Sequence, residues 1–265
     1  MHIGETSLIR RTLDNLREFR RLRRSSMQPD NGRAAPFPVF VINLERSPER
    51  RQYALAHLSS VGLSPSIFTA VDGKQLNLPY LVERGIYDDA LARESFARSL
   101  SLAEIGCSLS HFEVCRRIVS QELDFALVAE DDVHFPPRAS HMLGRVLASA
   151  PADWELIQLK FFSRRFQNDI AGFVSFPFED GLPVGATAYL IRLSCAKKIC
   201  ANALPIRFPA DSMLGRAAKW DVRIYGVYPQ IAGVNNVFPS SIQGDRNWRF
   251  RLSNFAKTLL LKVMR

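Results

Sequence analysis

Short apolar runs alternate with segments of helical spacing from residue 39 onward, and this alternation predicts an α/β fold. The runs short enough for strands are at 39–44, 66–70, 125–129, 154–162, 186–191 and 223–228. Helices are predicted between them at 47–61, 102–121, 139–150 and 194–204, with another after Asp211. The first two strands and the helix that joins them predict a right-handed βαβ unit, so we expect a mostly parallel sheet with flanking helices.

Two stretches depart from this alternation. Residues 74–100 are polar and irregular, with a short helix at most. Residues 163–185 are rich in Phe, Gly and Pro, and such a segment is long for a connection inside a compact domain. We therefore expect 163–185 to be a functional loop, either a lid or a platform for an acceptor.

The distribution of charge divides the chain into three parts. The net charge is +9, but residues 1–33 carry eight Arg against four acidic residues, and residues 245–265 carry six Lys or Arg against one. The interior is therefore neutral, which argues against a nucleic-acid partner, because a groove for nucleic acid needs positive charge across the folded surface. We expect a basic arm and linker at 1–38, a globular domain at 39–247 and a basic amphipathic segment at 248–265.

Both basic ends have features of membrane-surface helices. Apolar residues follow helical spacing among the arginines of the N-terminal arm, and 248–265 mixes many apolar residues with basic ones. A solvated arm is the alternative at the N-terminus, whereas the apolar content of 248–265 favours an anionic membrane surface. No stretch reaches the roughly 20 apolar residues of a membrane span, and no secretory signal begins the sequence. The four cysteines have neither zinc-finger nor CxxC spacing, so we expect reduced thiols in a cytoplasmic protein.

The strand predicted at 125–129 runs directly into Glu130, Asp131 and Asp132. Three adjacent carboxylates repel one another, and at the edge of a buried sheet they also lose hydration, so a cation is the simplest partner for them. Carboxylate oxygens suit a hard ion such as Mg²⁺ or Mn²⁺, which in turn favours a phosphate-bearing substrate. The alternative is a solvated acidic turn that binds nothing.

Further polar residues fall near the predicted strand ends. Asn43, Arg46 and Asp72 sit at the ends of the first two strands, where a nucleotide would bind in an open α/β sheet. No GxGxxG or Walker sequence supports a dinucleotide or P-loop site. His111, on a largely apolar helix, is by composition alone a core residue, and Asp211 by local sequence is a helix N-cap.

Four ordered blocks resemble glycosyltransferase family 25. They are VINLERSPERR at 41–51, EIGCSLSH at 104–111, LVAEDD at 127–132 and GATAYLI at 185–191. Bacterial members of that family build lipooligosaccharide and lipopolysaccharide, often as β-galactosyltransferases, and eukaryotic relatives glycosylate collagen. The resemblance implies a GT-A-like fold with a Rossmann-type nucleotide half, a UDP-sugar donor and inversion at the anomeric carbon.

The resemblance also implies roles for particular residues. Asn43, Arg46, Asp72, Ser110 and His111 fall in positions that bind the donor. Asp131 and Asp132 fall at the metal position, for Mn²⁺ or Mg²⁺, although Glu-Asp-Asp replaces the strict DxD spacing. Asp211 matches a carboxylate after the Tyr-containing strand.

Inverting transfer requires one carboxylate that takes the proton of the acceptor hydroxyl as the attack develops. Asp211 is the first candidate for this base and Glu130 the second. Arg46 and Arg50 are candidate phosphate partners, with solvated charge as the alternative for Arg50 and its neighbour Arg51.

The sequence thus predicts a transferase that moves a hexose, with galactose from UDP-galactose as first choice, to a lipid-linked oligosaccharide at the cytoplasmic face of the inner membrane. A metal-dependent phosphate hydrolase is one alternative, although no aspartyl nucleophile motif supports it. A membrane adaptor with a decayed site is another, although the intact acidic triplet speaks against it. A collagen-type transferase of the endoplasmic reticulum is a weaker variant, because neither a signal peptide nor a retention tail is found.

Overall fold

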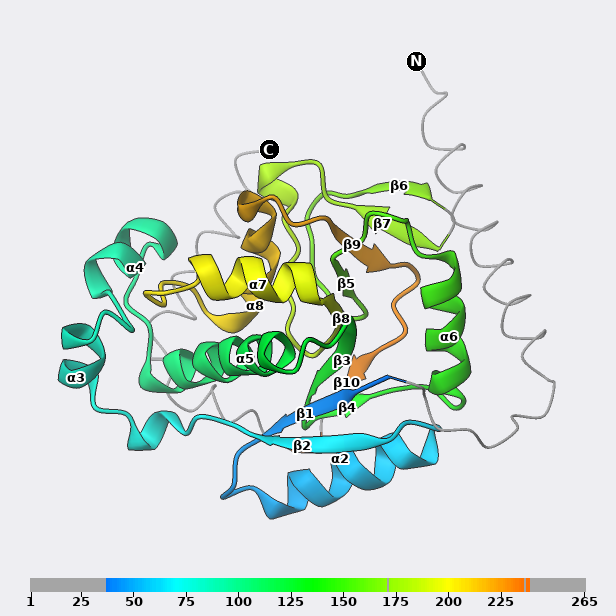
Figure 1. The fold of residues 1–265 in the computed structure, drawn as a ribbon, viewed down its shortest axis with the longest axis horizontal. Helices are drawn as coiled ribbons and strands as arrows, with labels where there is room; N and C mark the ends of the chain where they lie inside the picture. The colour runs from blue at the N-terminus through cyan, green and yellow to red at the C-terminus, as the bar shows by residue number, and fades with distance from the viewer. Residues whose placement is uncertain (1–36, 171, 236, 239–265) are drawn as a thin grey trace, which may run out of the picture.

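A mixed eight-stranded sheet runs through the part of the chain that this computed structural model describes, residues 37–170, 172–235 and 237–238 (Figure 1). The order across the sheet is β2-β1-β3-β8-β5-β9-β7-β6. Its strands are β1 (Val39–Asn43), β2 (Pro65–Thr69), β3 (Phe125–Glu130), β5 (Leu156–Gln158), β6 (Gln167–Ile170), β7 (Phe173–Ser175), β8 (Ala188–Arg192) and β9 (Ile224–Val227). A separate two-stranded sheet pairs β4 (Val133–His134) with β10 (Gly233–Val234).

The strand directions confirm the predicted α/β class with a mostly parallel sheet. Strands β2, β1, β3, β5, β9 and β6 run in one direction, and only β8 and β7 run in the other. The βαβ unit at the start of the domain is confirmed, since β1 and β2 pair in parallel across helix α2 (Pro48–Ser60). The basic ends predicted at 1–38 and 248–265 lie outside the described residues, apart from 37 and 38.

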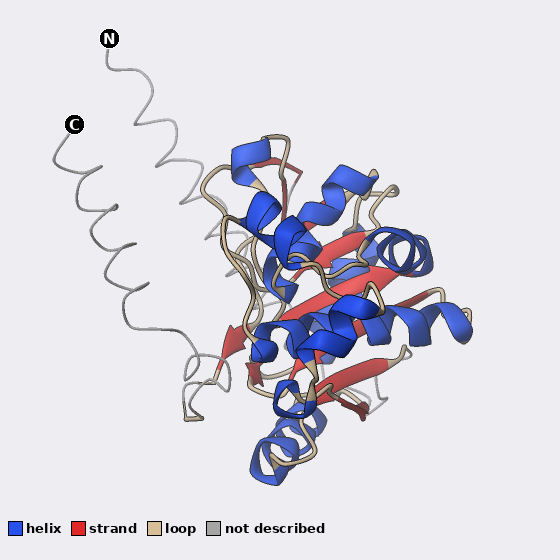
Figure 2. Ribbon diagram, turned by 90° about the vertical axis from the view of Figure 1, so that its left-hand side faces the viewer, coloured by secondary structure: helices blue, strands red, loops and turns tan. Residues whose placement is uncertain are grey.

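Two hydrophobic cores, one on each face of the sheet, hold the helices in place (Figures 1 and 2). Helices α5 (Leu102–Ser120), α7 (Leu193–Asn202) and α8 (Ala210–Arg216) pack on one face, and α2 and α6 (Ala139–Ser149) pack on the other. Strand β3 serves both cores, because Ala126 and Val128 face α5 while Leu127 and Ala129 face α2. Burying a side chain such as Leu127 completely contributes about 1.5 to 3 kcal/mol.

The predicted loop at 163–185 contains more regular structure than expected. Strands β6 and β7 form a hairpin that extends the main sheet, and the short helix η2 (Glu179–Gly181) follows it. Strand β7 pairs with β9, and Phe173 and Val174 are buried in that contact. These strands are short, so they lack the run of alternating residues that would have revealed them in the sequence.

Residues 74–100 also form more helix than the sequence suggested. The segment contains part of η1 (Gly73–Gln75), then α3 (Leu78–Glu83) and α4 (Asp89–Phe96). The side chains of Asn77 and Asp88 accept hydrogen bonds from the first turns of α3 and α4, so both act as N-caps. By contrast, Ser47 occupies the N-cap position of α2 without a side-chain cap, and α7 begins at Leu193, before the predicted Ser194 cap.

One further short helix lies beside the helices of this face. Helix η3 (Ala217–Trp220) follows α8 directly and packs against α7. Among the described residues, no helix combines the length and the apolar character that crossing a bilayer requires. All four cysteines lie in the described region and none forms a disulfide, as the sequence predicted.

A close approach of two glycines fixes helix α5 against the end of β2. A Cβ atom added to Gly106 would lie 2.8 Å from the backbone nitrogen of Gly73 and 2.8 Å from the carbonyl oxygen of Val71. Real Cβ atoms do not approach backbone so closely, so no larger residue fits without moving α5.

Replacing Gly106 with Ala is therefore expected to destabilise the protein by about 1 to 3 kcal/mol through overpacking. The matched control is Gly144→Ala in α6, where an added Cβ would meet nothing within 4 Å. That change is expected to be neutral or to stabilise by up to about 1 kcal/mol, because Ala has the higher helix propensity. Urea unfolding of both variants measures the difference; equal stabilities would contradict the close approach.

Candidate active site

The acidic triplet lies at the carboxyl end of β3, as predicted, and its side chains turn toward two different helices. Glu130 is the last residue of β3 and reaches toward α5. Asp131 and Asp132 occupy the turn before β4 and reach toward α2. The triplet is thus not a solvated turn, since Asp131 is only 6% exposed and both aspartates have partners within the protein.

Arg50 on α2 pairs with both aspartates. Its Nε donates to Asp131 Oδ1 at 2.7 Å, and its Nη2 donates to Asp132 Oδ2 at 2.8 Å and also contacts Asp131. The Arg50 side chain is 13% exposed, so this pair is largely removed from water. The solvated-helix alternative for Arg50 is therefore wrong, and the guanidinium supplies positive charge to the triplet from within the chain.

Asn43, predicted to bind the donor, holds Asp131 in place. Its Nδ2 donates to Asp131 Oδ2 at 2.7 Å and to the carbonyl oxygen of Ser47 at 3.2 Å, and its Oδ1 accepts from Arg51 Nε at 3.2 Å. Asn43 is 1% exposed. Both of its polar atoms are therefore engaged inside the protein, and Arg51, like Arg50, is bonded rather than solvated.

Asp132 is the member of the triplet with capacity left for a ligand. Its Oδ1 is buried and has no hydrogen-bond partner within the described residues. Burial raises the pKa of Asp132 above its ordinary range, and the nearby charge of Glu130 raises it further, although Arg50 opposes both effects. The positive charge of a cation bound here would oppose this shift by favouring the charged carboxylate.

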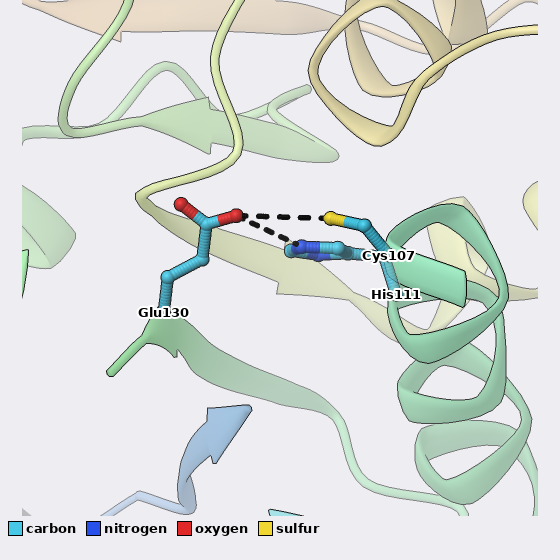
Figure 3. A group of neighbouring side chains, drawn as sticks. All are labelled: Cys107, His111 and Glu130. Atoms are coloured by element: carbon cyan, nitrogen blue, oxygen red, sulfur yellow. Dashed lines mark hydrogen bonds and ion pairs between the residues drawn. The ribbon is translucent and has the colours of Figure 1, made fainter. Parts of the chain in front are cut away.

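Glu130 faces two side chains of α5 that lie one helical turn apart (Figure 3). Cys107 Sγ lies 3.9 Å from Glu130 Oε1, and His111 Nε2 lies 3.7 Å from the same oxygen. The His111 ring is completely buried, and its Nδ1 lies 2.8 Å from the hydroxyl of Tyr189 on β8. Burial raises the pKa of the Cys107 thiol well above its ordinary value, and the charges of Glu130 and Asp211 raise it further.

Arg46 and Asp72, both predicted to bind the donor, pair with each other beyond the ends of β1 and β2. Arg46 Nε donates to Asp72 Oδ2 at 2.7 Å, and the Arg46 side chain remains 42% exposed. Hydrogen bonding to Arg46 lowers the pKa of Asp72, so this carboxylate stays charged. An exposed guanidinium at this edge of the sheet is well placed for a phosphate.

Ser110, the remaining predicted donor residue, is buried within α5. Its Oγ accepts from the backbone nitrogen of Val71 at 2.9 Å and donates to the carbonyl oxygen of Gly106 at 2.7 Å. Ser110 therefore anchors the end of β2 to α5 and keeps Asp72, the next residue after Val71, in register with the site.

Asp211 lies in the first turn of α8, which begins at Ala210, and Pro209 occupies the N-cap position. The N-cap interpretation of Asp211 is therefore wrong by two positions. Its Oδ1 accepts from the backbone nitrogen of Ser212 at 2.6 Å, and its carbonyl oxygen accepts from Gly185 at 3.2 Å. The charge of Asp211 acts on both Cys107 and Arg98, so this carboxylate lies in the neighbourhood of those two residues.

The described residues offer two kinds of metal ligand in this region. The hard oxygen donors are Asp132, with its unpaired Oδ1, and Glu130 beside it; Asp131 has both oxygens occupied by Arg50 and Asn43. Cys107, His111 and Glu130 form a second group whose ligand atoms lie within 4.8 Å of one another. The carboxylates fit a hard divalent cation, because the buried unpaired oxygen of Asp132 needs a positive partner.

Residues 37–214 match the family described as Glycosyltransferase family 25 (LPS biosynthesis protein). The chain belongs to this family. All four sequence blocks fall inside the matched range, as do Asp72 and Asp211, and the resemblance stated from those blocks is confirmed.

Three relatives illustrate the range of this family. A glycosyltransferase 25 family member of Aedes aegypti is 33% identical over 248 residues, 83% of this chain and 40% of that protein. Procollagen galactosyltransferase 2 of Mus musculus is 38% identical over 125 residues, 46% of this chain and 20% of that protein. Inactive glycosyltransferase 25 family member 3 of Homo sapiens is 30% identical over 235 residues, 79% of this chain and 38% of that protein. The chain therefore spans less than half the length of these relatives.

Three contributions to the site were missed in the sequence. The sequence suggests either a phosphate contact or a solvated charge for Arg50. Only the fold shows that it pairs with aspartates 81 and 82 positions away. Only one feature of the sequence could have indicated the group of Cys107, His111 and Glu130. This is the four-residue spacing that puts Cys107 and His111 on one face of a helix. Tyr189, the partner of His111, left none.

The raised pKa of Asp132 predicts how its removal changes stability with pH. The folded state binds the Asp132 proton more tightly than the unfolded state, so this group favours folding below the ordinary aspartate pKa and loses that contribution as pH rises through the folded pKa. We expect the stability of Asp132→Asn relative to the wild type to be more favourable at pH 7 than at pH 4. Denaturant unfolding at both pH values measures this, with the exposed Asp180→Asn as control. A relative stability that is constant, or more favourable at pH 4, would contradict the shift.

Proposed function

We propose that the protein is an inverting glycosyltransferase that moves a hexose from a UDP-sugar to a lipid-linked oligosaccharide, with galactose from UDP-galactose as the first choice. The family description refers to lipopolysaccharide biosynthesis, and the murine relative is named as a galactosyltransferase. The observation that carries the proposal is the buried Oδ1 of Asp132, which has no hydrogen-bond partner among the residues that the structure describes. It lies near Glu130, at the strand edge where nucleotide ligands of α/β sheets bind.

In this proposal Asp132 and Glu130 hold Mn²⁺ or Mg²⁺, and Asp131 has a supporting role. The sequence suggested Asp131 and Asp132 as ligands, but Asp131 already accepts from Arg50 and Asn43. The bound cation would stabilise the negative charge that develops on the departing diphosphate. The Arg50 guanidinium keeps the two aspartates close together and oriented before the cation arrives.

Arg46 is the proposed contact of the chain with the donor phosphates. It is the exposed member of the Arg46–Asp72 pair, and charge-assisted hydrogen bonds from a guanidinium suit phosphate oxygens. Asn43 and Ser110 act on the donor site indirectly, because their polar atoms bond to Asp131 and to the backbone of Val71. His111 acts through Glu130, whose Oε1 its Nε2 faces at 3.7 Å.

Asp211 remains the first choice for the general base. As the acceptor hydroxyl attacks the anomeric carbon, the bond from that carbon to the diphosphate oxygen breaks, and Asp211 takes the hydroxyl proton. Glu130, the second candidate, is assigned to the cation instead. The hydrogen bond from the backbone nitrogen of Gly185 to the Asp211 carbonyl oxygen supports this role, because it joins Asp211 to segment 163–185, the proposed acceptor platform.

Membrane attachment completes the proposal, with the protein peripheral on the cytoplasmic face of the inner membrane. The proposed contacts are the basic ends, 1–38 and 248–265, which together carry the whole net charge of +9. A lipid-linked acceptor is held at such a surface, and each basic residue near anionic lipid contributes about 1 kcal/mol to attachment.

The donor site is tested by calorimetric titration of the full chain with UDP, with and without Mn²⁺. We expect binding that requires the metal and that Asp132→Asn loses, because that variant removes a cation ligand. Asp221→Asn, at an aspartate whose side chain is 85% exposed and lies outside segment 163–185, should bind as the wild type does. Failure of the folded wild type to bind UDP under either condition would contradict the proposal that the donor is a UDP-sugar.

The base is tested by turnover of Asp211→Asn. We expect kcat to fall about 10²- to 10⁴-fold, the usual contribution of a general base, while metal-dependent UDP affinity stays the same. The exposed Asp221→Asn, with its side chain 85% exposed, should retain full turnover. Because acceptor identity is open, hydrolysis of the UDP-sugar serves as the assay alongside transfer to oligosaccharide. Full activity in Asp211→Asn would return the role to another carboxylate.

A further inference from the structure

Cys107, His111 and Glu130 bring sulfur, nitrogen and oxygen ligand atoms together at the junction of α5 and β3 (Figure 3). Cys107 and His111 project from successive turns of the same helical face, and Glu130 points at them from the end of the strand. The Glu130 oxygen lies 3.9 Å from the sulfur and 3.7 Å from His111 Nε2.

His111 carries a second indication of a ligand. Its ring is 0% exposed, and within the described residues its Nε2 has no hydrogen-bond partner although it faces Glu130 and Cys107. Leaving a buried polar atom unpaired costs about 1 to 3 kcal/mol. The opposite ring atom, Nδ1, is fixed 2.8 Å from the Tyr189 hydroxyl, so the ring cannot rotate to satisfy Nε2 without losing that contact.

We propose that Cys107, His111 and Glu130 bind a thiophilic divalent transition ion of the Zn²⁺ class, with a fourth position open to water. Zinc bonds of about 2.3 Å to sulfur and 2.0 to 2.2 Å to nitrogen and oxygen, at tetrahedral angles, put ligand atoms about 3.4 to 3.6 Å apart. The two separations from Glu130 exceed these by only a few tenths of an ångström, and all three ligand atoms lie within 4.8 Å of one another. Rotation of the Cys107 and Glu130 side chains would close the group around the ion.

The chemistry of the three donors separates this site from the one for a hard cation. A thiolate and an imidazole favour Zn²⁺ or Co²⁺ over Mg²⁺, whereas Asp132 offers only carboxylate oxygen. Tyr189 completes the arrangement, because a metal-bound histidine normally directs its other ring nitrogen to a fixed hydrogen-bond partner. On coordination the Cys107 thiol releases its proton to solvent. The Cys107–His111–Glu130 site does not depend on the proposed transferase activity, although Glu130 is a proposed ligand in this site and in the one for the hard cation.

Co²⁺ titration of the full chain, stripped of metal by a chelator and without nucleotide, tests the proposal. We expect one sulfur-ligated Co²⁺ per chain, with a sulfur-to-cobalt charge-transfer band in the near ultraviolet and the visible bands of tetrahedral cobalt. Added Zn²⁺ should displace the cobalt and remove both. Because the readout is spectroscopic and uses no donor, failure here and failure of UDP binding are separate results.

Two matched cysteine variants locate the sulfur. Cys107→Ser should lose the charge-transfer band, while Cys200→Ser, which alters a partly buried thiol on α7, should keep it. His111→Gln should weaken Co²⁺ binding by at least about tenfold, and circular dichroism verifies that each variant is folded. Absence of the band in the folded wild type would overturn the proposal. Persistence of the band in Cys107→Ser, or its loss in Cys200→Ser, would do the same.

Discussion

The pairing of Arg50 with Asp131 and Asp132 is the interaction on which the site depends. Two carboxylates at the end of a buried strand lose hydration and repel each other. Removing one partner of a buried ion pair typically destabilises a protein by about 3 to 5 kcal/mol, because the other charge is left uncompensated. The guanidinium offsets this from α2, on the far side of the sheet from α5. With Asn43 bonded to Asp131, strand β1, helix α2 and the turn after β3 form one connected unit.

Helix α5 supplies the other half of the site. Its close approach to the backbone at Gly73, and the bond from Val71 to Ser110, fix the helix along the end of β2. These two contacts determine where Cys107 and His111 lie along the helix axis relative to Glu130. The geometry at the strand edge is therefore determined by backbone contacts some distance from the carboxylates.

Local patterns in the sequence were sufficient for β1, α2, β2 and β3, and for the position of the acidic triplet, because these elements are contiguous and their apolar periodicity is clear. The role of Arg50 could not be read locally, since its partners are 81 and 82 residues away. Asp211 was misplaced because α8 begins at Ala210, after an N-cap position held by Pro209, whose side chain has no hydrogen-bond acceptor and so gives no capping signal. The hairpin of β6 and β7 escaped because its strands are too short to show a period.

The direction of β8 has a consequence for how proteins of this design can diversify. Ala188 pairs antiparallel with Ala129, and the backbone nitrogen of Glu130 donates to the Thr187 carbonyl oxygen at 2.9 Å. It is therefore the chain entering β8, rather than the chain leaving it, that arrives beside the carboxylates. A change of length or of residues in the chain that enters β8 would alter the surroundings of the carboxylates, while the β3–β8 pairing that carries them stays intact.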